Sequence, residues 1–201
     1  MTSVTIVDSG TGNLFSLTEA FRRAGVKAQV TRDPADVRRA KCLVLPGVAS
    51  FPAVVRGINE ARRAIEESAQ DHVPLLGICA GMQVMFESSE EGQGRGLGLF
   101  QGAVREIHAD VVPHIGWSPI QAKQGSWLHG LTPDAMVYYA HSYAAPADSP
   151  GVVATSDYQG PFAAAMHREN VFAVQFHPEK SGPIGCLVLQ NFLRESGVLQ
   201  S

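Results

Sequence analysis

The segment that decides the fold is Val73-Pro74-Leu75-Leu76-Gly77-Ile78-Cys79-Ala80-Gly81, in which a nearly apolar run leads into a cysteine flanked by glycines. A short apolar run bounded by turn residues is typical of a buried strand in a parallel sheet. A helical pattern follows through about Phe86. The segment therefore predicts a strand over Val73–Ile78, a sharp turn at Cys79 and then a helix.

Similar strands and helices alternate in the part of the chain before this segment. The predicted strands are Val4–Val7, Ala28–Thr31 and Cys42–Leu45. The predicted helices are Leu14–Ala24, which ends at Gly25, and a long one over Ala53–Ala69. Alternation of this kind indicates βαβ units, whose parallel sheet is covered by helices on both faces. We therefore expect a doubly wound α/β fold with four parallel core strands.

The second half of the chain has shorter apolar runs, separated by Pro, Gly and Ser, and predicts antiparallel additions to the sheet. The expected strands are Met136–Tyr139, Val152–Thr155, Phe162–His167 and Val171–Phe176, and the expected last helix is Ile184–Glu195. No linker or internal repeat divides the 201 residues, which predicts a single domain over 1–201.

Composition excludes several classes of protein. The formal net charge of −3 provides no basic field for nucleic acid or for an anionic membrane. No apolar run reaches the roughly 18 residues of a membrane span, and the first residues do not resemble a signal peptide, so we expect a cytoplasmic protein. The chain has three cysteines, and they are widely spaced. This pattern predicts neither a disulfide framework nor a metal site. We expect no cofactor.

The strongest chemical motif is Gly77-Ile78-Cys79-Ala80-Gly81, which has the form of a nucleophile elbow. The glycines remove Cβ atoms that would collide where strand and helix approach each other. A cysteine at a helix N-terminus is also favoured as the thiolate. Cys79 is therefore the candidate nucleophile, whereas Cys42 in a strand and Cys186 in the last helix are expected in the core.

His177-Pro178-Glu179 supplies the base and the acceptor that such a nucleophile needs. Proline favours an extended backbone at His177, so the side chains of His177 and Glu179 are expected on one side of the strand end. The aromatic segments around His114 and His141 are typical of a pocket or a partner surface. The remaining histidines are expected at the surface, and they are His72, His108, His129 and His167.

An oxyanion formed during acyl transfer also needs donors. The expected ones are the Ala80 N–H and the loop Pro46-Gly47-Val48, because that loop follows a neighbouring strand. The loop Gly10-Thr11-Gly12-Asn13 resembles a dinucleotide loop, but Phe15 stands where the third glycine is required. A nucleotide site is therefore not expected.

These motifs, in this order, resemble the class I (triad) glutamine amidotransferases, and the match runs essentially end to end. The carrying segments are Pro46-Gly47-Val48, Gly77–Gln83 and His177–Gly182. Within the family the chain is most similar to the branch of glutaminase subunits that serve imidazole glycerol phosphate synthases. The segments that point to this branch are Asp8–Leu14, Pro113–Trp117, His141–Tyr143 and Lys180–Gly182.

The resemblance implies a flavodoxin-like fold and hydrolysis of glutamine to glutamate and ammonia. Cys79 would attack the side-chain amide, His177 would move the proton and Glu179 would orient His177. Gln83 and the backbone of Ser142 and Tyr143 would contact the glutamine.

The resemblance also implies a partner, a (βα)8-barrel synthase subunit that forms a heterodimer with this chain and receives the ammonia. The barrel would then make imidazole glycerol phosphate and aminoimidazole carboxamide ribotide in histidine biosynthesis. Asn13, Tyr138 and Lys180 are the expected partner-face residues. The chain departs from the family at Ala49, where a second glycine is usual in the oxyanion loop.

Two alternatives remain at this point. One is a glutaminase subunit of another synthase, such as the synthase that makes pyridoxal phosphate. The other is a non-catalytic protein on a similar fold with a redox or chaperone-like role. The intact His-Pro-Glu segment argues against the second, because a sensor thiol does not need an oriented base.

Overall fold

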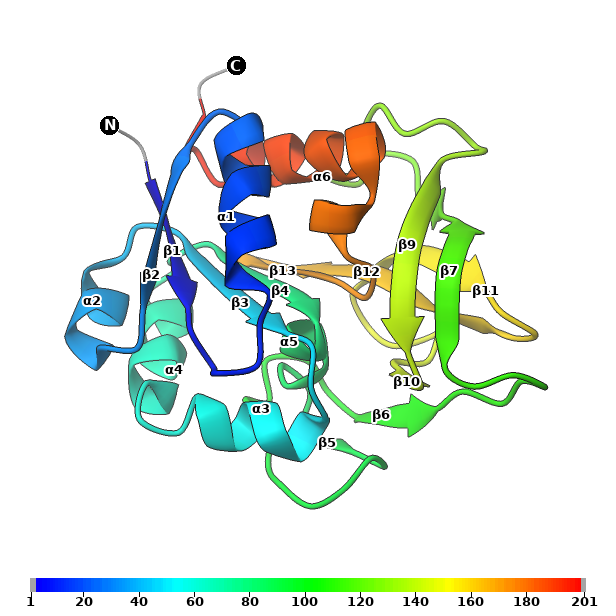
Figure 1. Cartoon of the computed structure of the whole chain (residues 1–201), viewed down its shortest axis with the longest axis horizontal. Coiled ribbons are helices and arrows are strands. Elements are labelled where there is room, and N and C mark those ends of the chain that lie inside the picture. The colour runs from blue at the N-terminus through cyan, green and yellow to red at the C-terminus, as the bar shows by residue number, and fades with distance from the viewer. Residues whose placement is uncertain (1–2, 200–201) are drawn as a thin grey trace.

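The computed structural model describes residues 3–199 and contains an eight-stranded sheet in which the five strands from one edge inward are parallel. The sheet order is β2-β1-β3-β4-β13-β12-β11-β8. Its parallel strands are β2 (Lys27–Thr31), β1 (Ser3–Val7), β3 (Leu43–Gly47), β4 (Leu75–Cys79) and β13 (Val171–Val174). The expected doubly wound, mostly parallel fold is confirmed (Figure 1).

Three strands extend the sheet in the antiparallel direction, namely β12 (Pro161–Arg168), β11 (Val152–Asp157) and β8 (Gln121–Ala122). The prediction that Val171–Phe176 is an antiparallel addition was wrong in part. β13 is antiparallel to β12 but parallel to β4, so the parallel core has five strands rather than four. All four residues of β13 are buried, as expected of a strand covered on both faces.

Helices cover both faces of the sheet (Figure 1). α1 (Leu14–Arg23) and α6 (Gly182–Glu195) lie on one face, and α2 (Pro34–Arg39), α3 (Phe51–Gly57) and α4 (Arg62–Gln70) lie on the other. The predicted long helix Ala53–Ala69 is therefore two helices, because the poor helix formers Gly57 and Asn59 lie at the break. α2 was not predicted; its cap is the Asp33 carboxylate, which accepts from the Ala35 N–H.

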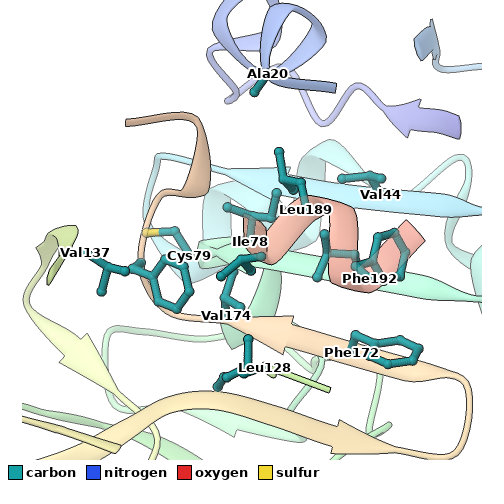
Figure 2. Close-up of a cluster of buried hydrophobic side chains, with 14 of the residues drawn as sticks. Ala20, Val44, Ile78, Cys79, Leu128, Val137, Phe172, Val174, Leu189 and Phe192 are labelled. Atoms are coloured by element: carbon teal, nitrogen blue, oxygen red, sulfur yellow. The ribbon is translucent and has the colours of Figure 1, made fainter. Parts of the chain in front are cut away.

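Each face of the sheet has its own apolar core. Figure 2 shows one of them, in which Leu189 and Phe192 of α6 lie over Val44, Ile78 and Val174 of the sheet. Cys42 is buried, so the prediction that it lies in the core is confirmed. Burial raises the pKa of its thiol to about 12. Cys186 is half-buried on α6 and packs against the same cluster.

A separate two-stranded ribbon lies beside the carboxyl ends of β4 and β13. It pairs β7 (His114–Pro119) with β9 (Met136–His141), so the predicted strand Met136–Tyr139 belongs to this ribbon and not to the main sheet. A third sheet joins β10 (Tyr143–Ala144), β6 (Ala103–Glu106) and β5 (Ser88–Ser89). No helix in the described part of the chain is long and apolar enough to cross a membrane.

Two phenylalanines, one buried and one exposed, test the contribution of the apolar core to stability. Phe192 is fully buried, whereas Phe15 is 79% exposed. We expect Phe192→Ala to lower the free energy of unfolding by about 3–5 kcal/mol, because it removes the ring and leaves a cavity. Phe15→Ala is the matched control and should change it by less than about 0.5 kcal/mol. Urea unfolding of the isolated chain measures both, and equal losses would contradict the assignment.

Candidate active site

Cys79 occupies a strained turn between β4 and the short helix α5 (Ala80–Gln83). Its φ of 55° and ψ of −116° are unfavourable for a residue with a side chain and cost about 1–3 kcal/mol. A Cβ at Gly81 would lie 1.8 Å from the Leu45 carbonyl oxygen, and one at Gly77 would lie 2.9 Å from the Cα of Met82. The two glycines are therefore required by close approach, and the turn presents Cys79 at the end of the sheet.

The helix after Cys79 ends at Gln83, so its predicted extension to Phe86 was wrong. The Val84 carbonyl accepts from the Leu97 N–H at 2.7 Å, and the Met85 carbonyl accepts from the Phe100 N–H at 3.0 Å. The N–H groups of Met85 and Phe86 donate to the Met82 and Gln83 carbonyls, each at 3.1 Å, so they reach back three residues instead of four and the segment ends as a tight turn. The helix dipole at Cys79 is consequently that of a single turn.

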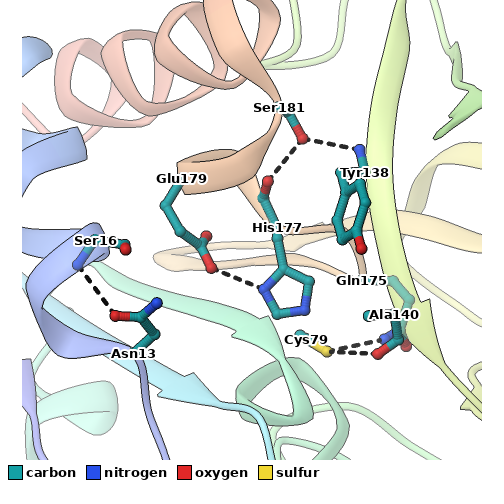
Figure 3. Close-up of polar contacts among 9 residues, drawn as sticks. All are labelled: Asn13, Ser16, Cys79, Tyr138, Ala140, Gln175, His177, Glu179 and Ser181. Carbon is teal, nitrogen blue, oxygen red and sulfur yellow. Dashed lines mark hydrogen bonds and ion pairs between the residues drawn. The ribbon is translucent and has the colours of Figure 1, made fainter. Parts of the chain in front are cut away.

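His177 and Glu179 face each other beside Cys79 (Figure 3). His177 Nδ1 and Glu179 Oε1 are 2.8 Å apart, and both side chains are almost completely buried. His177 has the extended backbone that was predicted, with φ −101° and ψ 96°, and the two side chains meet on one side. Glu179 itself lies in the 3₁₀ turn η1 (Pro178–Lys180) and not on a continued strand. The Ser181 hydroxyl donates to the His177 carbonyl at 2.7 Å and holds the turn.

The environment of His177 favours its charged form. Burial alone would lower the pKa of His177, but the hydrogen bonds and negative charges of Cys79 and Glu179 outweigh it and raise the pKa to about 10. Glu179 Oε2 is buried without a hydrogen-bond partner among the described residues. At neutral pH the site therefore favours the imidazolium form of His177.

A pocket of about 400 Å³ opens onto Cys79 and His177. Among the residues expected at the site, it is lined by Val48, Ala80, Gln83, Ser142, Tyr143 and Lys180. Glu91 also lines it, although no motif in the sequence marked this residue; its carboxylate accepts from the Phe51 N–H. Among the described residues no cluster of His, Cys, Asp and Glu is fit to hold a metal ion.

The expected oxyanion loop is only partly arranged as a donor. Gly47 pairs with Cys79 across β3 and β4, and Val48 lies at the pocket. The Val48 N–H, however, donates to the Thr11 carbonyl at 2.9 Å and is not available to an oxyanion. Ala80 begins α5, where backbone N–H groups have no partner inside the helix. The structure thus presents one of the two expected donors.

The residues expected to bind glutamine are also held by hydrogen bonds. The Gln83 side chain donates from Nε2 to the Tyr143 carbonyl at 2.7 Å. The Ser142 carbonyl accepts from the Ile107 N–H at 2.9 Å. These bonds leave the Gln83 side chain and the Ser142–Tyr143 segment as preformed walls of the pocket.

Of the histidines outside the triad, two are buried and one is half-buried. His114 and His141 form a hydrogen-bonded pair, and only His141 lines the pocket. His167 lies on β12, in agreement with the predicted strand Phe162–His167, but it is half-buried rather than at the surface and stacks on Phe172 with ring centroids 4.3 Å apart.

The expected partner-face residues lie around the site but outside the triad. Asn13 is exposed, and its side chain caps α1 by accepting from the Ser16 N–H at 3.3 Å (Figure 3). Lys180 is exposed and places Nζ 5.4 Å from the ring centroid of the half-buried Tyr138. Three exposed apolar side chains lie beside these residues: Val48 and Ile115 line the pocket, and the ring of Trp117 lies 6.0 Å from that of Tyr138.

Comparisons with known proteins identify the family of the chain. The model of the class-I glutamine amidotransferase family matches residues 5–196. The imidazole glycerol phosphate synthase subunit HisH of Deinococcus radiodurans is 44% identical over 200 residues, covering 96% of this chain and 93% of the relative. The HisH subunit of Thermococcus kodakarensis is 41% identical over 198 residues, covering 95% of this chain and 99% of the relative.

Solved structures show the same fold at low identity. A crystal structure described as a glutamine amidotransferase has a TM-score of 0.77 at 18% identity, covering 96% of this chain and 98% of that one. The structure of PurLQS from Thermotoga maritima has a TM-score of 0.74 at 17% identity, with the same coverage of 96% and 98%. With a family model that spans nearly the whole chain and relatives above 40% identity, this chain belongs to the class-I glutamine amidotransferases.

Proposed function

We propose that the chain is one glutaminase domain that supplies ammonia to an imidazole glycerol phosphate synthase. The observation that carries the proposal is the buried group of Cys79, His177 and Glu179, of which Cys79 and His177 line the pocket. The relatives above 40% identity are named as subunits of that synthase, which supports this branch of the family. The same names disfavour the two alternatives, a subunit of another synthase and a redox protein.

The geometry supports a thioester mechanism. The Cys79 thiolate attacks the amide carbon of the glutamine side chain, and His177 gives its proton to the leaving nitrogen, which departs as ammonia. Water, deprotonated by His177, then cleaves the thioester and releases glutamate. Glu179 fixes Nδ1 of His177, so that the opposite ring nitrogen serves Cys79 and the substrate.

The pocket also offers partners for the α-ammonium group and for the side chain of glutamine. Among the described residues that line it, Glu91 contributes the one carboxylate, and the substrate's α-ammonium group needs such a partner. Gln83 and the Ser142–Tyr143 segment enclose the substrate side chain. We therefore assign glutamine recognition to Glu91, Gln83, Ser142 and Tyr143.

Full activity requires a second oxyanion donor in addition to Ala80. We infer that the Gly47–Val48 peptide must turn, so that the Val48 N–H leaves the Thr11 carbonyl and faces the pocket. Gly47 permits such a rotation, whereas Ala49 restricts it relative to glycine. The arrangement in which Thr11 holds the Val48 N–H is accordingly a low-activity state.

The partner that we propose is a (βα)8-barrel subunit, bound as a heterodimer to the face around the pocket. Val48, Ile115 and Lys180 both line the pocket and reach the surface, so a subunit that covers them would also receive the ammonia. Asn13, Tyr138 and Trp117 extend the same face. We place the complex in the cytoplasm, where a reactive thiol such as Cys79 is kept reduced.

Replacing the nucleophile tests the assignment directly. Cys79→Ala should abolish glutamine hydrolysis and glutamine-dependent synthesis by the complex, because no thioester can form. Synthesis from added ammonium salt should remain. Cys186→Ala, at a half-buried thiol on α6, is the control and should retain both activities. Glutaminase activity that survives Cys79→Ala would contradict the mechanism.

The raised pKa of His177 predicts a pH-dependent stability. A group whose pKa is higher in the folded state stabilises the fold fully below its ordinary value of 6.5, and that stability disappears as the pH rises through about 10. Glu179→Gln removes one of the negative charges that raise the pKa. The variant should lose about 1–3 kcal/mol of unfolding free energy at pH 6, and the difference should shrink toward pH 10.

Glu195→Gln, at an exposed carboxylate at the end of α6, is the control for this measurement and should change stability by less than about 0.5 kcal/mol. Denaturant unfolding of both variants between pH 6 and pH 10 provides the comparison. A difference between the wild type and Glu179→Gln that stays constant over this range would count against the charged His177.

The partner face is tested by Trp117→Asp. The Trp117 side chain is 51% exposed beside the pocket, and an apolar interface would bury it against the barrel subunit. The dissociation constant of the complex should rise by at least about tenfold, measured by titration calorimetry. Val30→Asp, at a 40% exposed position on the edge strand β2, should leave it unchanged. Equal affinities for wild type and Trp117→Asp would exclude Trp117 from the interface.

A further inference from the structure

A buried amide outside the triad touches the nucleophile. Gln175 is fully buried, and its Nε2 lies 3.7 Å from Cys79 Sγ (Figure 3). The parallel register of β13 on β4 pairs Val174 with Ile78, so the next residues, Gln175 and Cys79, come level with each other. Burying an amide is costly unless its donors and acceptor are satisfied. Gln175 meets this condition through the sulfur on one side and Gln83 on the other.

The direction of the Gln175 amide is set by Gln83. The Tyr143 carbonyl can only accept, so the Gln83 group 2.7 Å from it is the NH₂ group. The same nitrogen is 3.2 Å from the Gln175 side chain, which must therefore present its oxygen there. Both hydrogens of the Gln83 amide are then used. The NH₂ group of Gln175 consequently faces the sulfur of Cys79.

A second donor fixes the Tyr143 carbonyl from the other side. His141 Nδ1 is 3.0 Å from this carbonyl and must donate to it. Burial and the neighbouring His114 lower the pKa of His141 to about 3, so His141 is neutral and its Nε2 accepts. His114 Nδ1 lies 3.1 Å from that nitrogen, and the Ser118 hydroxyl donates to His114 Nε2 at 2.8 Å. The chain of bonds therefore has one direction from Ser118 to Tyr143.

We propose that Gln175 stabilises the thiolate of Cys79 through a side-chain N–H···S hydrogen bond, in an orientation set by Gln83, whose acceptor at the Tyr143 carbonyl is also held by the His114–His141 pair. A hydrogen bond to the charged form of a group favours that form. The helix α5 has only one turn, so its dipole is a weak substitute for such a donor. The Ala140 carbonyl, 3.9 Å from Sγ, is an acceptor and stabilises only the thiol.

This role differs from that of the triad, although it rests on the proposed function of Cys79 as the nucleophile. The titratable side chains of the described residues that line the pocket with Cys79 are His177, which Glu179 supports, His141, Glu91, Tyr143 and Lys180. Gln175 carries no charge and titrates with none of them. It adds a fixed dipole at the sulfur that is present before the substrate or a partner binds.

The test is the pH dependence of Cys79 alkylation by iodoacetamide in the intact chain, followed by peptide mass spectrometry. Gln175→Met keeps the volume but removes the donor. We expect the midpoint of the reaction to rise by about one pH unit, which slows alkylation roughly tenfold below the midpoint. The kcat for glutamine should fall while KM changes little, because Gln175 does not line the pocket.

Two further variants keep the test decisive. Asn191→Leu removes another fully buried amide, one that donates to the His129 carbonyl at 2.7 Å, and it should leave the Cys79 midpoint unchanged. Gln83→Met removes the group that orients Gln175, and it should give a smaller rise in the midpoint. If Gln175→Met does not fold, the midpoint of Gln83→Met decides whether the Gln175 amide stabilises the thiolate.

An unchanged midpoint in folded Gln175→Met overturns the inference while leaving Cys79 as the nucleophile. If only Gln83→Met folds, an unchanged midpoint in that variant overturns it equally. Wild-type Cys79 that reacts no faster than the half-buried Cys186 would instead overturn the proposed function, and the inference with it. A rise in both variants, with none in Asn191→Leu, supports the assignment.

Discussion

The parallel pairing of β13 with β4 is the contact on which the site depends. It joins segments 96 residues apart and brings Cys79, Gln175 and His177 to the same end of the sheet. Neither strand supplies the site alone, because β4 ends at the nucleophile and β13 leads to the base. α6 packs over both strands and, through Phe192 and Leu189, holds them in one apolar core. The antiparallel strands beyond β13 cover its other edge, so the pairing lies inside the sheet rather than at its margin.

The strained backbone conformation of Cys79 persists because the packing around it fixes the turn between β4 and α5. Gly81 allows the helix to approach the Leu45 carbonyl, and the carbonyls of Val84 and Met85 are used by a distant segment. A longer helix would have supplied a stronger dipole to the thiolate. The structure instead provides a charged ring at His177 and a neutral amide at Gln175, both delivered by the neighbouring strand.

Two buried histidines near the pocket illustrate how neighbours decide charge. His177 lies between a carboxylate and a thiol, and its pKa rises to about 10 despite burial. His141 lies beside His114, which offers no negative charge, and its pKa falls to about 3. One therefore moves protons in the proposed reaction, whereas the other serves as a fixed donor and acceptor. The residue type is the same, and the difference arises from what each ring contacts.

The sequence by itself determined the alternation of strands and helices, the glycine-flanked turn at Cys79 and the candidate roles of His177 and Glu179. These features are local, because they depend on periodicity and on residues a few positions apart. Only the tertiary structure decided that β13 is parallel to β4, that the Val48 N–H is held by Thr11 and that Gln175 faces the sulfur. Each of these depends on backbone or amide groups meeting across long stretches of chain, and such groups leave no pattern in a single sequence.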